Sequence, residues 1–437
     1  MTTHDQPRLA ALELLRLVRD DGAYANLALA QVLRKFALHG RDAAFTVELA
    51  YGVLRNQMLY DQYIQDCANR EVSAIEPEVL DVLRMGVHQV VAMRVPDHAA
   101  VDSTVQLIRE KSSPGQAQAR AGFVNAILHC LIRARDAGLP EPTDLSLRYS
   151  HPQWIVDSYR EALDSHGRTT AEVAELMTSN NEPAKPVLAV RSGELAIEGT
   201  VPGQWSPVAR VVDSVIPSDL IAGKSLDLIV QDEGSQLVAQ AFLLAQPQGR
   251  EAAWLDMCAG PGGKAALISD SVPEGVSFTA VELHEHRATL VLNIVQPDTR
   301  VLIGDSRNRP WGNIFFDRVL VDAPCTGLGA LRRRPEARWR KSESDLRDLN
   351  PLQEELLMAA IDSTRSGGVI CYVTCSPHVD ETQGILGSVL EQRSDVALED
   401  ARPLFPGVSD LGSGPTVQLW PHVHGTDAMF FALLRRR

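Results

Sequence analysis

The sequence predicts a multidomain protein in which an all-α domain comes first and an α/β domain follows. The chain has 437 residues, about three times the length of a typical domain. Apolar residues recur at helical spacing through residues 1–135, whereas predicted strands and helices alternate through residues 231–437. That alternation is typical of a parallel sheet covered by helices on both faces. Residues 136–230 are interpreted as a linker followed by a small accessory subdomain.

The first domain is predicted from helical periodicity that is interrupted by helix breakers. Apolar residues three or four positions apart include Ala10, Leu14, Leu17 and Val18, then Leu80, Leu83, Val87, Val90 and Val91, then Val124, Ile127, Leu128 and Leu131. The segments are separated by Gly22, Gly40, Pro77, Pro96 and the pair Pro114-Gly115. We therefore expect a helical bundle, whose composition alone indicates no function.

The middle stretch changes character twice. Residues 137–143 contain glycine and two prolines and are predicted to form a linker, and a short helical stretch opens at residues 151–154. Residues 187–191 and 209–213 are rich in Val and Ala and lie between Gly and Pro turns. We expect both to be short strands.

The charge distribution bears on the class of partner. The formal net charge is 42 − 56 = −14, which taken alone argues against nucleic acid. Residues 332–341, however, contain six basic residues, one acid and Trp339. Such a run is either a solvated face or a contact surface for phosphates and bases, and the Trp favours the contact surface.

Several classes of protein are excluded by composition. No run approaches the roughly 20 apolar residues that a membrane span needs, and residues 1–7 do not resemble a secretory signal. Six cysteines in so long a chain, without a C-x-x-C pair, indicate neither a disulfide framework nor a zinc site. We expect a cytoplasmic, monomeric protein with free thiols and with neither membrane nor metal partners.

A glycine-rich turn opens the α/β domain. An apolar strand ending near Asp256 runs into Gly260, Gly262 and Gly263, and a helix follows. Glycines let the backbone approach a ligand closely, and the helix beyond offers unpaired N–H groups. Glu282, at the end of the next predicted strand, is placed to bind a ribose hydroxyl pair. The pattern also fits the dinucleotide fingerprint, so it leaves open a nicotinamide enzyme, a methyltransferase or a structural turn.

Further polar residues follow the later strands of this domain. Asp305 follows the strand at residues 301–303, and Asp322 ends the next strand, three residues before Cys325. Cys375 follows the strand at residues 368–374. Ligands bind at the carboxyl ends of such strands. We therefore expect Cys325 and Cys375 to serve chemistry, whereas the remaining cysteines are interpreted as small buried hydrophobes: Cys67, Cys130, Cys258 and Cys371.

A nucleoside-cofactor turn, a carboxylate and two thiols suit one reaction well. Carbon 5 of cytosine is a poor nucleophile until a thiolate adds to carbon 6 and makes carbon 5 enamine-like, able to attack a sulfonium methyl. A second group must then remove the carbon 5 proton so that the first thiol can leave. An acid near the base can hold the ring nitrogen protonated meanwhile.

These motifs carry a family resemblance. The runs Cys258-Ala-Gly-Pro-Gly-Gly-Lys264, Asp322-Ala-Pro-Cys325 and Thr374-Cys375-Ser376 resemble the RNA 5-methylcytosine methyltransferases of the RsmB/Sun family. The resemblance covers roughly residues 150–437 and includes residues 230–236, 332–336, 420–422 and 426–430. Residues 1–135 resemble the NusB-like RNA-binding domain, notably at 122–128. This pairing is typical of bacterial enzymes that methylate a cytosine of 16S ribosomal RNA.

The resemblance implies a fold, a cofactor, a partner and roles for individual residues. It implies a Rossmann-like, class I methyltransferase domain that uses S-adenosylmethionine and acts on 16S ribosomal RNA. Cys375 would be the nucleophile, Cys325 the group that enables product release, and Asp322 the contact to the cytosine ring. The implied S-adenosylmethionine pocket is lined by Cys258, Ala259, Gly260, Pro261, Gly262, Gly263, Lys264, Glu282, Asp305 and Asp322.

Three other functions remain open. The same chemistry on transfer RNA is opposed by the NusB-like half. A non-catalytic RNA-binding or antitermination protein is opposed by the presence of both cysteines, Asp322 and the glycine turn. A nicotinamide oxidoreductase would explain the turn and Glu282 but would leave Cys325 and Cys375 without a role.

Overall fold

The chain folds into two compact units. The computed structural model describes residues 5–192, 196–213 and 227–437. One unit comprises Met1–Val156 with Arg333–Arg340, and the other comprises Asp157–Arg332 with Lys341–Arg437. The first unit thus extends beyond the expected boundary at residue 135. It also includes residues 333–340, which lie within the expected α/β domain at residues 231–437. The boundary at residue 230 stays a prediction, and residues 193–195 and 214–226 of the expected accessory subdomain lie outside the described residues.

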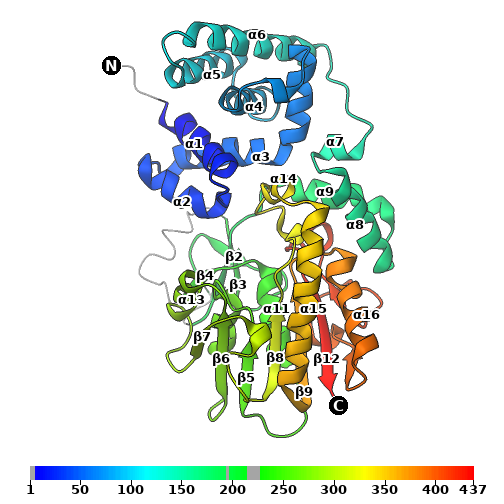
Figure 1. The fold of residues 1–437 in the computed structure, drawn as a ribbon. Coiled ribbons are helices and arrows are strands. Elements are labelled where there is room, and N and C mark those ends of the chain that lie inside the picture. Colours follow the sequence, from blue (N-terminus) through cyan, green and yellow to red (C-terminus); the bar gives the residue numbers. More distant parts are fainter. Residues whose placement is uncertain (1–4, 193–195, 214–226) are drawn as a thin grey trace. The chain divides into compact units, whose positions relative to one another are not determined.

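The first unit is helical, as the apolar spacing predicts (Figure 1). Its helices are α1 (Gln6–Asp20), α2 (Ala25–Lys35), α3 (Gly40–Ala68), α4 (Pro77–Val91), α5 (Asp97–Lys111), α6 (Ala117–Asp136), α7 (Leu145–Tyr149) and α14 (Ala337–Arg340). The Asp5 carboxylate caps α1 by accepting from the Arg8 N–H, and Pro77 begins α4, where its missing N–H costs nothing. Leu14, Leu83 and Leu128 are fully buried in one apolar core. The expected bundle is therefore confirmed.

Part of the basic run at 332–341 is used inside this unit. The Arg338 side chain is buried, and its Nη1 donates to the carbonyl oxygen of Arg55 at 3.0 Å. The indole N–H of Trp339 donates to the carbonyl oxygen of Leu54 at 2.6 Å. The interpretation as a contact surface for RNA is therefore wrong for Arg338, and for the half-buried Trp339 it stays a prediction. Their partners are backbone carbonyls almost 300 residues earlier in the chain, which no local pattern reveals.

A small antiparallel sheet lies in the second unit, after α8 (Gln153–Ser165) and α9 (Val173–Asn181). Its strand order is β2-β3-β1-β4, with β1 (Val187–Val190), β2 (Thr200–Pro202), β3 (Ala209–Val212) and β4 (Leu228–Val230). The strands expected at 187–191 and 209–213 are confirmed as β1 and β3. The sequence reasoning missed β2 and β4, which have only three residues each.

The large sheet of the second unit has eight strands within the described residues, in the order β10-β12-β9-β8-β5-β6-β7 with β11 beside β12 (Figure 1). The strands are β5 (Ala253–Asp256), β6 (Ser277–Glu282), β7 (Arg300–Ile303), β8 (Phe316–Asp322), β9 (Thr364–Thr374), β10 (Val396–Glu399), β11 (Val417–Gln418) and β12 (Phe430–Arg436). Strands β5 to β9 pair in parallel, as expected, whereas β10, β11 and β12 pair antiparallel. The α/β prediction is confirmed, and the sheet is mixed.

Alternating side chains along the central strands bury both faces of this sheet. One face packs its apolar side chains, such as Trp254 and Leu320, with those of α11 (Glu233–Leu244) and α12 (Gly263–Ser269). The opposite face, with Leu255 and Val321, packs with α15 (Leu346–Ser363) and α16 (Gln383–Gln392). Two buried faces explain why the strands are nearly continuous apolar runs.

The strand order places several polar residues at one edge of the sheet. Asp256, Glu282, Asp322 and Thr374 end β5, β6, β8 and β9, which are parallel. The chain order reverses between β5 and β8, since β6 and β7 extend to one side and β8 and β9 to the other. Open α/β sheets bind ligands in the crevice outside this reversal point. The candidate site therefore lies at the carboxyl ends of β5 and β8.

Candidate active site

The glycine turn (residues 257–263) joins β5 to α12 and leaves no room for side chains at two positions. A Cβ atom on Gly260 would lie 2.1 Å from Oε2 of Glu282. Gly262 has φ +114°, and a Cβ there would lie 2.6 Å from the Ile294 side chain. Glycine removes both obstacles. The turn therefore presents bare backbone at the carboxyl end of the sheet.

Glu282 is hydrogen-bonded to this turn. Its carboxylate is nearly buried and accepts from the Gly260 N–H at 3.1 Å and from the His284 N–H at 3.0 Å. Arg287, on α13 (Glu285–Leu292), donates to the carbonyl oxygen of Gly260 at 2.5 Å. Glu282 and the turn thus form one rigid group, which suits a ligand bearing hydroxyls beside the turn.

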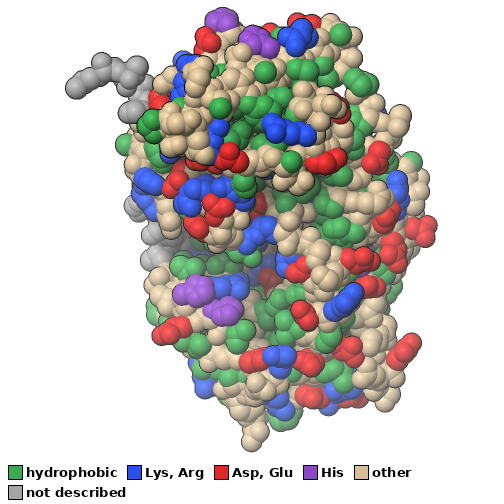
Figure 2. Space-filling model, turned by 45° about the horizontal axis from the view of Figure 1, so that its top comes forward, with side chains coloured by type: hydrophobic (Ala, Val, Ile, Leu, Met, Phe, Trp, Pro, Cys, Tyr) green, Lys and Arg blue, Asp and Glu red, His purple; other side chains and the backbone are tan. Residues whose placement is uncertain are grey.

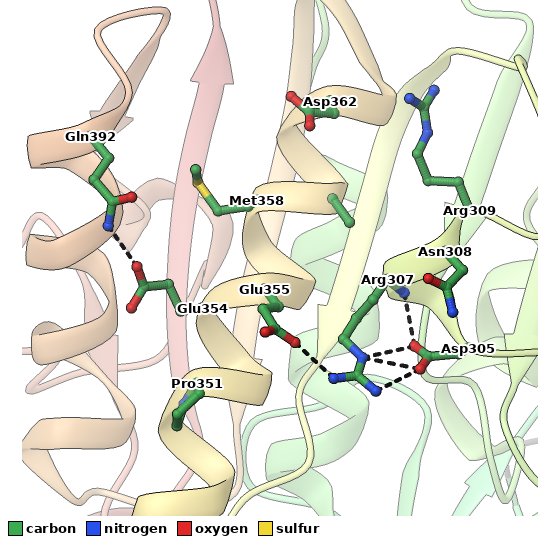
Figure 3. Close-up of a pocket in the computed structure, with 11 residues that line it drawn as sticks. Asp305, Arg307, Asn308, Arg309, Pro351, Glu354, Glu355, Met358, Asp362 and Gln392 are labelled. Carbon is green, nitrogen blue, oxygen red and sulfur yellow. Dashed lines mark hydrogen bonds and ion pairs between the residues drawn. The ribbon is translucent and has the colours of Figure 1, made fainter.

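Asp305 lies beside the same turn, but its carboxylate already has a basic partner. Asp305 precedes a short 3₁₀ helix (Ser306–Asn308), and the Ser306 hydroxyl donates to the carbonyl oxygen of Met257 at 2.6 Å. Both carboxylate oxygens of Asp305 accept from Arg307, which also donates to Glu355 on α15 at 2.7 Å (Figure 3). The Arg307 guanidinium lowers the pKa of Asp305.

Asp305 and Arg307 line an open pocket of about 860 Å³ between the 3₁₀ helix and α15 (Figure 3). Other acidic side chains at this pocket are Glu354, Glu355 and Asp362. In this structure the Asp305 side chain pairs with Arg307. The expectation that Asp305 lines the cofactor site stays a prediction.

Lys264 and Asp322 form a salt bridge at the reversal point of the sheet. The Lys264 ammonium donates to Oδ2 of Asp322 at 2.8 Å. Burial on its own would lower the pKa of Lys264, but the adjacent Asp322 carboxylate outweighs it and the pKa rises. Lys264 therefore stays charged and places a fixed cation at the end of β8.

Asp256 is a further buried carboxylate that the sequence reasoning did not single out for a role. Its Oδ1 accepts from the Cys258 N–H at 3.2 Å, and its Oδ2 is buried without a hydrogen-bond partner among the described residues. Burial, and secondly the charge of Asp322, raise the pKa of Asp256 to about 7. Its position at the end of β5, inside the glycine motif, was the available signal.

The two thiols expected to serve chemistry are adjacent. The Sγ atoms of Cys325 and Cys375 lie 3.3 Å apart, the former in a loop after β8 and the latter directly after β9. The hydrogen bond with Cys375, followed by burial, raises the pKa of Cys325 well above its usual range. A negative charge on Cys375, when its thiol ionises, would raise the pKa of Lys264, so the thiols and the Lys264–Asp322 pair belong to one site.

The surroundings of this site contain no metal centre in the part of the chain that is described. Across residues 5–192, 196–213 and 227–437, no three His, Cys, Asp or Glu side chains are grouped so that they could hold an ion. Over the same ranges, none of the helices combines the length and the apolar character that crossing a bilayer requires. Acidic and basic side chains are interspersed over the face shown in Figure 2.

Comparison with protein families gives two matches. Residues 241–435 match the model of the 16S rRNA methyltransferases RsmB/F, and residues 5–133 match the NusB family. The chain is 45% identical to a putative methyltransferase of Mycobacterium tuberculosis, over 99% of this chain and 97% of that protein. It is 30% identical to the ribosomal RNA small subunit methyltransferase B of Xanthomonas campestris, over 98% and 96% of the two chains.

Solved structures share the fold at lower identity. The crystal structure of PH0851 superposes with a TM-score of 0.79 at 20% identity and covers 100% of both chains. The structure of NSun6 from Pyrococcus horikoshii with SFG has a TM-score of 0.54 at 18% identity, over 65% of this chain and 98% of that one. Together with the relatives at 30% identity or more, the family matches show that this chain belongs to the RsmB/F family of S-adenosylmethionine-dependent 16S rRNA methyltransferases.

Proposed function

We propose that this protein methylates carbon 5 of one cytosine in 16S ribosomal RNA through a covalent bond between Cys375 and the base. The observation that carries the proposal is the 3.3 Å approach of the Cys325 and Cys375 thiols next to the Lys264–Asp322 pair. In the proposed reaction one thiol adds to the pyrimidine and the other assists its release. The relatives named ribosomal RNA small subunit methyltransferase B support the choice of RNA.

The residues around the glycine turn fit S-adenosylmethionine. Gly260 and Gly262 let the turn pack closely against Glu282 and Ile294, where a Cβ would clash, and Glu282 is held beside the turn as an acceptor for ribose hydroxyls. The residues that would hold the cofactor are Cys258, Ala259, Gly260, Pro261, Gly262, Gly263, Lys264, Glu282, Asp305 and Asp322. When bound, S-adenosylmethionine supplies an electrophilic methyl group on its sulfonium sulfur.

Cys375 would begin the reaction by adding its thiolate to carbon 6 of the cytosine. The electron pair of the carbon 5–carbon 6 double bond then makes carbon 5 nucleophilic. The Lys264–Asp322 pair would bind the ring and hold a proton at N3, because a fixed ion pair at the end of β8 can stabilise the charge that develops there. Both roles use groups that already lie at one edge of the sheet.

Cys325 would assist the release of the methylated base. After Cys325 loses its own proton to solvent, its thiolate accepts the carbon 5 proton. The electron pair of the broken carbon–hydrogen bond restores the carbon 5–carbon 6 double bond, and Cys375 departs as a thiolate. The hydrogen bond with Cys375, followed by burial, raises the pKa of Cys325, which favours its thiol form while Cys375 attacks and makes its thiolate a stronger base for the later step.

The test is trapping of RNA on a denaturing gel. In a Cys325→Ala protein, Cys375 should still add to the base, and carbon 5 of the base should still accept the methyl group. The RNA should not be released, so the gel should show a shifted band. Cys375→Ala and the double variant should give none. Cys130→Ala, which removes a thiol of the helical unit, serves as the matched control. A band with Cys375→Ala but not with Cys325→Ala would exchange the two roles, and no band with either would contradict the covalent mechanism.

The RNA substrate is tested separately. Bisulfite mapping of 16S ribosomal RNA from cells with and without the protein should show one cytosine that loses protection in its absence. Loss of a transfer RNA signal instead would favour the transfer RNA alternative. Tighter binding of NAD than of S-adenosylmethionine in a titration would favour an oxidoreductase. The expectation of a cytoplasmic monomer stays a prediction.

A further inference from the structure

A buried polar cluster lies directly behind the two thiols and is centred on Glu381. This residue ends a short 3₁₀ helix (Val379–Glu381) that begins four residues after Cys375, and its side chain has no exposed surface. Gln353 on α15 and Tyr372 on β9 are equally buried beside it. Burying a carboxylate is costly unless hydrogen bonds compensate it, so the identity of its partners is informative.

The Glu381 carboxylate holds the residue that follows Cys325. Its Oε1 accepts from the Thr326 N–H at 2.7 Å, and its Oε2 accepts from the Thr326 hydroxyl. The side-chain amide of Gln353 donates both to Oε1 of Glu381 at 3.1 Å and to the carbonyl oxygen of Pro324 at 2.8 Å. The residues on either side of Cys325 are therefore tied to this one buried group.

The same cluster reaches the loop of the other thiol. The Thr326 hydroxyl lies 3.0 Å from the hydroxyl of Ser376, the residue that follows Cys375. The Gly329 N–H donates to the carbonyl oxygen of Cys375 at 2.9 Å, and a Cβ on Gly329 would lie 2.7 Å from that oxygen. The two loops are thus joined close to both sulfurs.

We propose that Glu381 is a positioning residue, which holds the Cys325 loop against the Cys375 loop so that the Cys325 thiol is placed for the release step. It does not touch the base, and the role in release rests on the proposed function. Cys375 directly follows the central strand β9 and is held by it, whereas Cys325 lies in a loop and depends on Thr326. Loss of the hydrogen bonds between Glu381 and Thr326 should therefore slow the release of the methylated base by Cys325 more than the attack of Cys375 on carbon 6.

The negative charge of the Glu381 carboxylate also acts on Cys325, by raising its pKa. After the hydrogen bond with Cys375 and burial, the Glu381 carboxylate is among the causes that raise the pKa of Cys325. A negative charge beside Cys325 disfavours a second thiolate there. The carboxylate would therefore help to keep the Cys325 side chain a thiol while Cys375 attacks.

The experiment compares Glu381→Gln and Thr326→Val with Glu391→Gln, which changes an exposed glutamate on α16. Glu381→Gln removes the charge at nearly constant volume, and Thr326→Val removes only the hydroxyl that links Glu381 to Ser376. Multiple turnover should fall by about 10- to 100-fold, the loss expected when a catalytic group is misplaced by about 1 Å. Single-turnover methyl transfer should fall much less, and the covalent protein–RNA band should accumulate.

A second measurement, made without RNA, tests whether the sulfur atoms of Cys325 and Cys375 remain close and aligned. Diamide, an azo compound, accepts two electrons and two protons from a pair of thiols and becomes a hydrazine, while the thiols become a disulfide. Formation of the Cys325–Cys375 disulfide, mapped by peptide mass, should be fast in the wild type and in Glu391→Gln. It should be about tenfold slower when either Glu381 or Thr326 is changed, since disulfide formation needs close, aligned sulfurs.

The outcomes separate the two proposals. Slower disulfide formation together with no trapping by Cys325→Ala would leave the positioning role standing and overturn the covalent mechanism. Trapping by Cys325→Ala with unchanged disulfide formation in both variants would overturn the positioning role. Equal losses in methyl transfer and release, with a lowered melting temperature in both variants, would also overturn it in favour of a purely structural role.

Discussion

The glycine turn and the two thiol loops (residues 323–331 and 375–381) lie at the same edge of the sheet, but they satisfy their polar groups differently. Each has a buried carboxylate behind it, Asp256 for the turn and Glu381 for the loops. Oδ2 of Asp256 has no hydrogen-bond partner among the described residues, whereas both oxygens of Glu381 accept hydrogen bonds. The carboxylate behind the thiol loops is therefore fully hydrogen-bonded, whereas the carboxylate behind the turn keeps one buried oxygen without a partner among the described residues.

This difference has a physical rationale. In the proposed mechanism two sulfurs must keep a fixed relation before the substrate arrives, and a fully bonded network provides that rigidity. A cofactor that must enter and leave needs groups whose hydrogen bonds are made on binding. The following predictions test whether the two regions really divide in this way, beginning with the largest effect.

Cys375→Ala should abolish turnover and leave the affinity for S-adenosylmethionine close to that of the wild type. The thiol belongs to the loops that would meet the base, and not to the glycine turn. Isothermal titration with S-adenosylmethionine and a methyl-transfer assay on 16S ribosomal RNA measure the two quantities. Loss of cofactor binding by a folded variant would show that the two regions are not independent.

Gly262→Ala should weaken S-adenosylmethionine binding by about tenfold, because a perturbation of about 1.4 kcal/mol has that effect on affinity. Its Cβ would meet Ile294 at 2.6 Å and the Cα of Val291 at 3.2 Å, so the turn must move relative to α13. Gly275→Ala is the matched control, since Gly275 has φ +81° with no atom within 4 Å of the new Cβ.

Both glycine variants carry the strain of a left-handed backbone, about 1–2 kcal/mol, and should lose similar amounts of thermal stability from it. Only Gly262→Ala should also lose cofactor affinity while retaining the rate of disulfide formation between Cys325 and Cys375. Equal affinities in the two variants would argue against a cofactor site at the glycine turn.

Asp256→Asn should change how stability depends on pH. The pKa of Asp256 in the folded protein is about 7, above the value of about 3.9 for an exposed aspartate. The folded protein therefore keeps a proton that the unfolded chain releases. The resulting stabilisation is fully present below about pH 4 and is lost as the pH rises through 7, at up to about 1.4 kcal/mol per pH unit.

Urea unfolding at several pH values between 4 and 8 measures this effect. The free energy of unfolding of the wild type, relative to Asp256→Asn, should decrease over that interval. Asp298→Asn, at an exposed position, should follow the wild type. Parallel profiles for wild type and Asp256→Asn would mean that Asp256 is ionised throughout and has a partner after all.

Much of the fold could be predicted because its signals are local. Helical spacing placed Leu14, Leu83 and Leu128 in the core of the bundle, and strand ends located Glu282 and Cys375. The parallel part of the sheet followed from the alternation of strands and helices. The antiparallel strands β10 to β12 did not, because pairing direction is decided by tertiary contacts.

The parts of the site that sequence reasoning missed are those that depend on distant partners. Arg307 pairs with both Asp305 and Glu355, and so joins the end of a strand to a helix residue 48 positions later. Glu381 follows Cys375 closely, but its role depends on Thr326, 55 residues earlier. A single sequence read on its own contains no signal for such distant pairs. The residues Asp322 and Cys325 lie in one short motif, so they could be recognised without such a signal.

The segment Arg333–Arg340 has a consequence for the order in which the protein can be made. A ribosome releases the first helices of the bundle early, but that bundle also contains eight residues that emerge only after the whole glycine turn and the first thiol loop. Until then the Ala25 N–H lacks its Glu336 partner and the Leu54 carbonyl lacks Trp339. Nascent chains shorter than about 340 residues should therefore present an incomplete bundle, and its last contacts close over almost 300 residues, a slow kind of folding event. Proteolysis of ribosome-bound chains stalled before and after this point should show protection of α2 and α3 rising only in the longer ones.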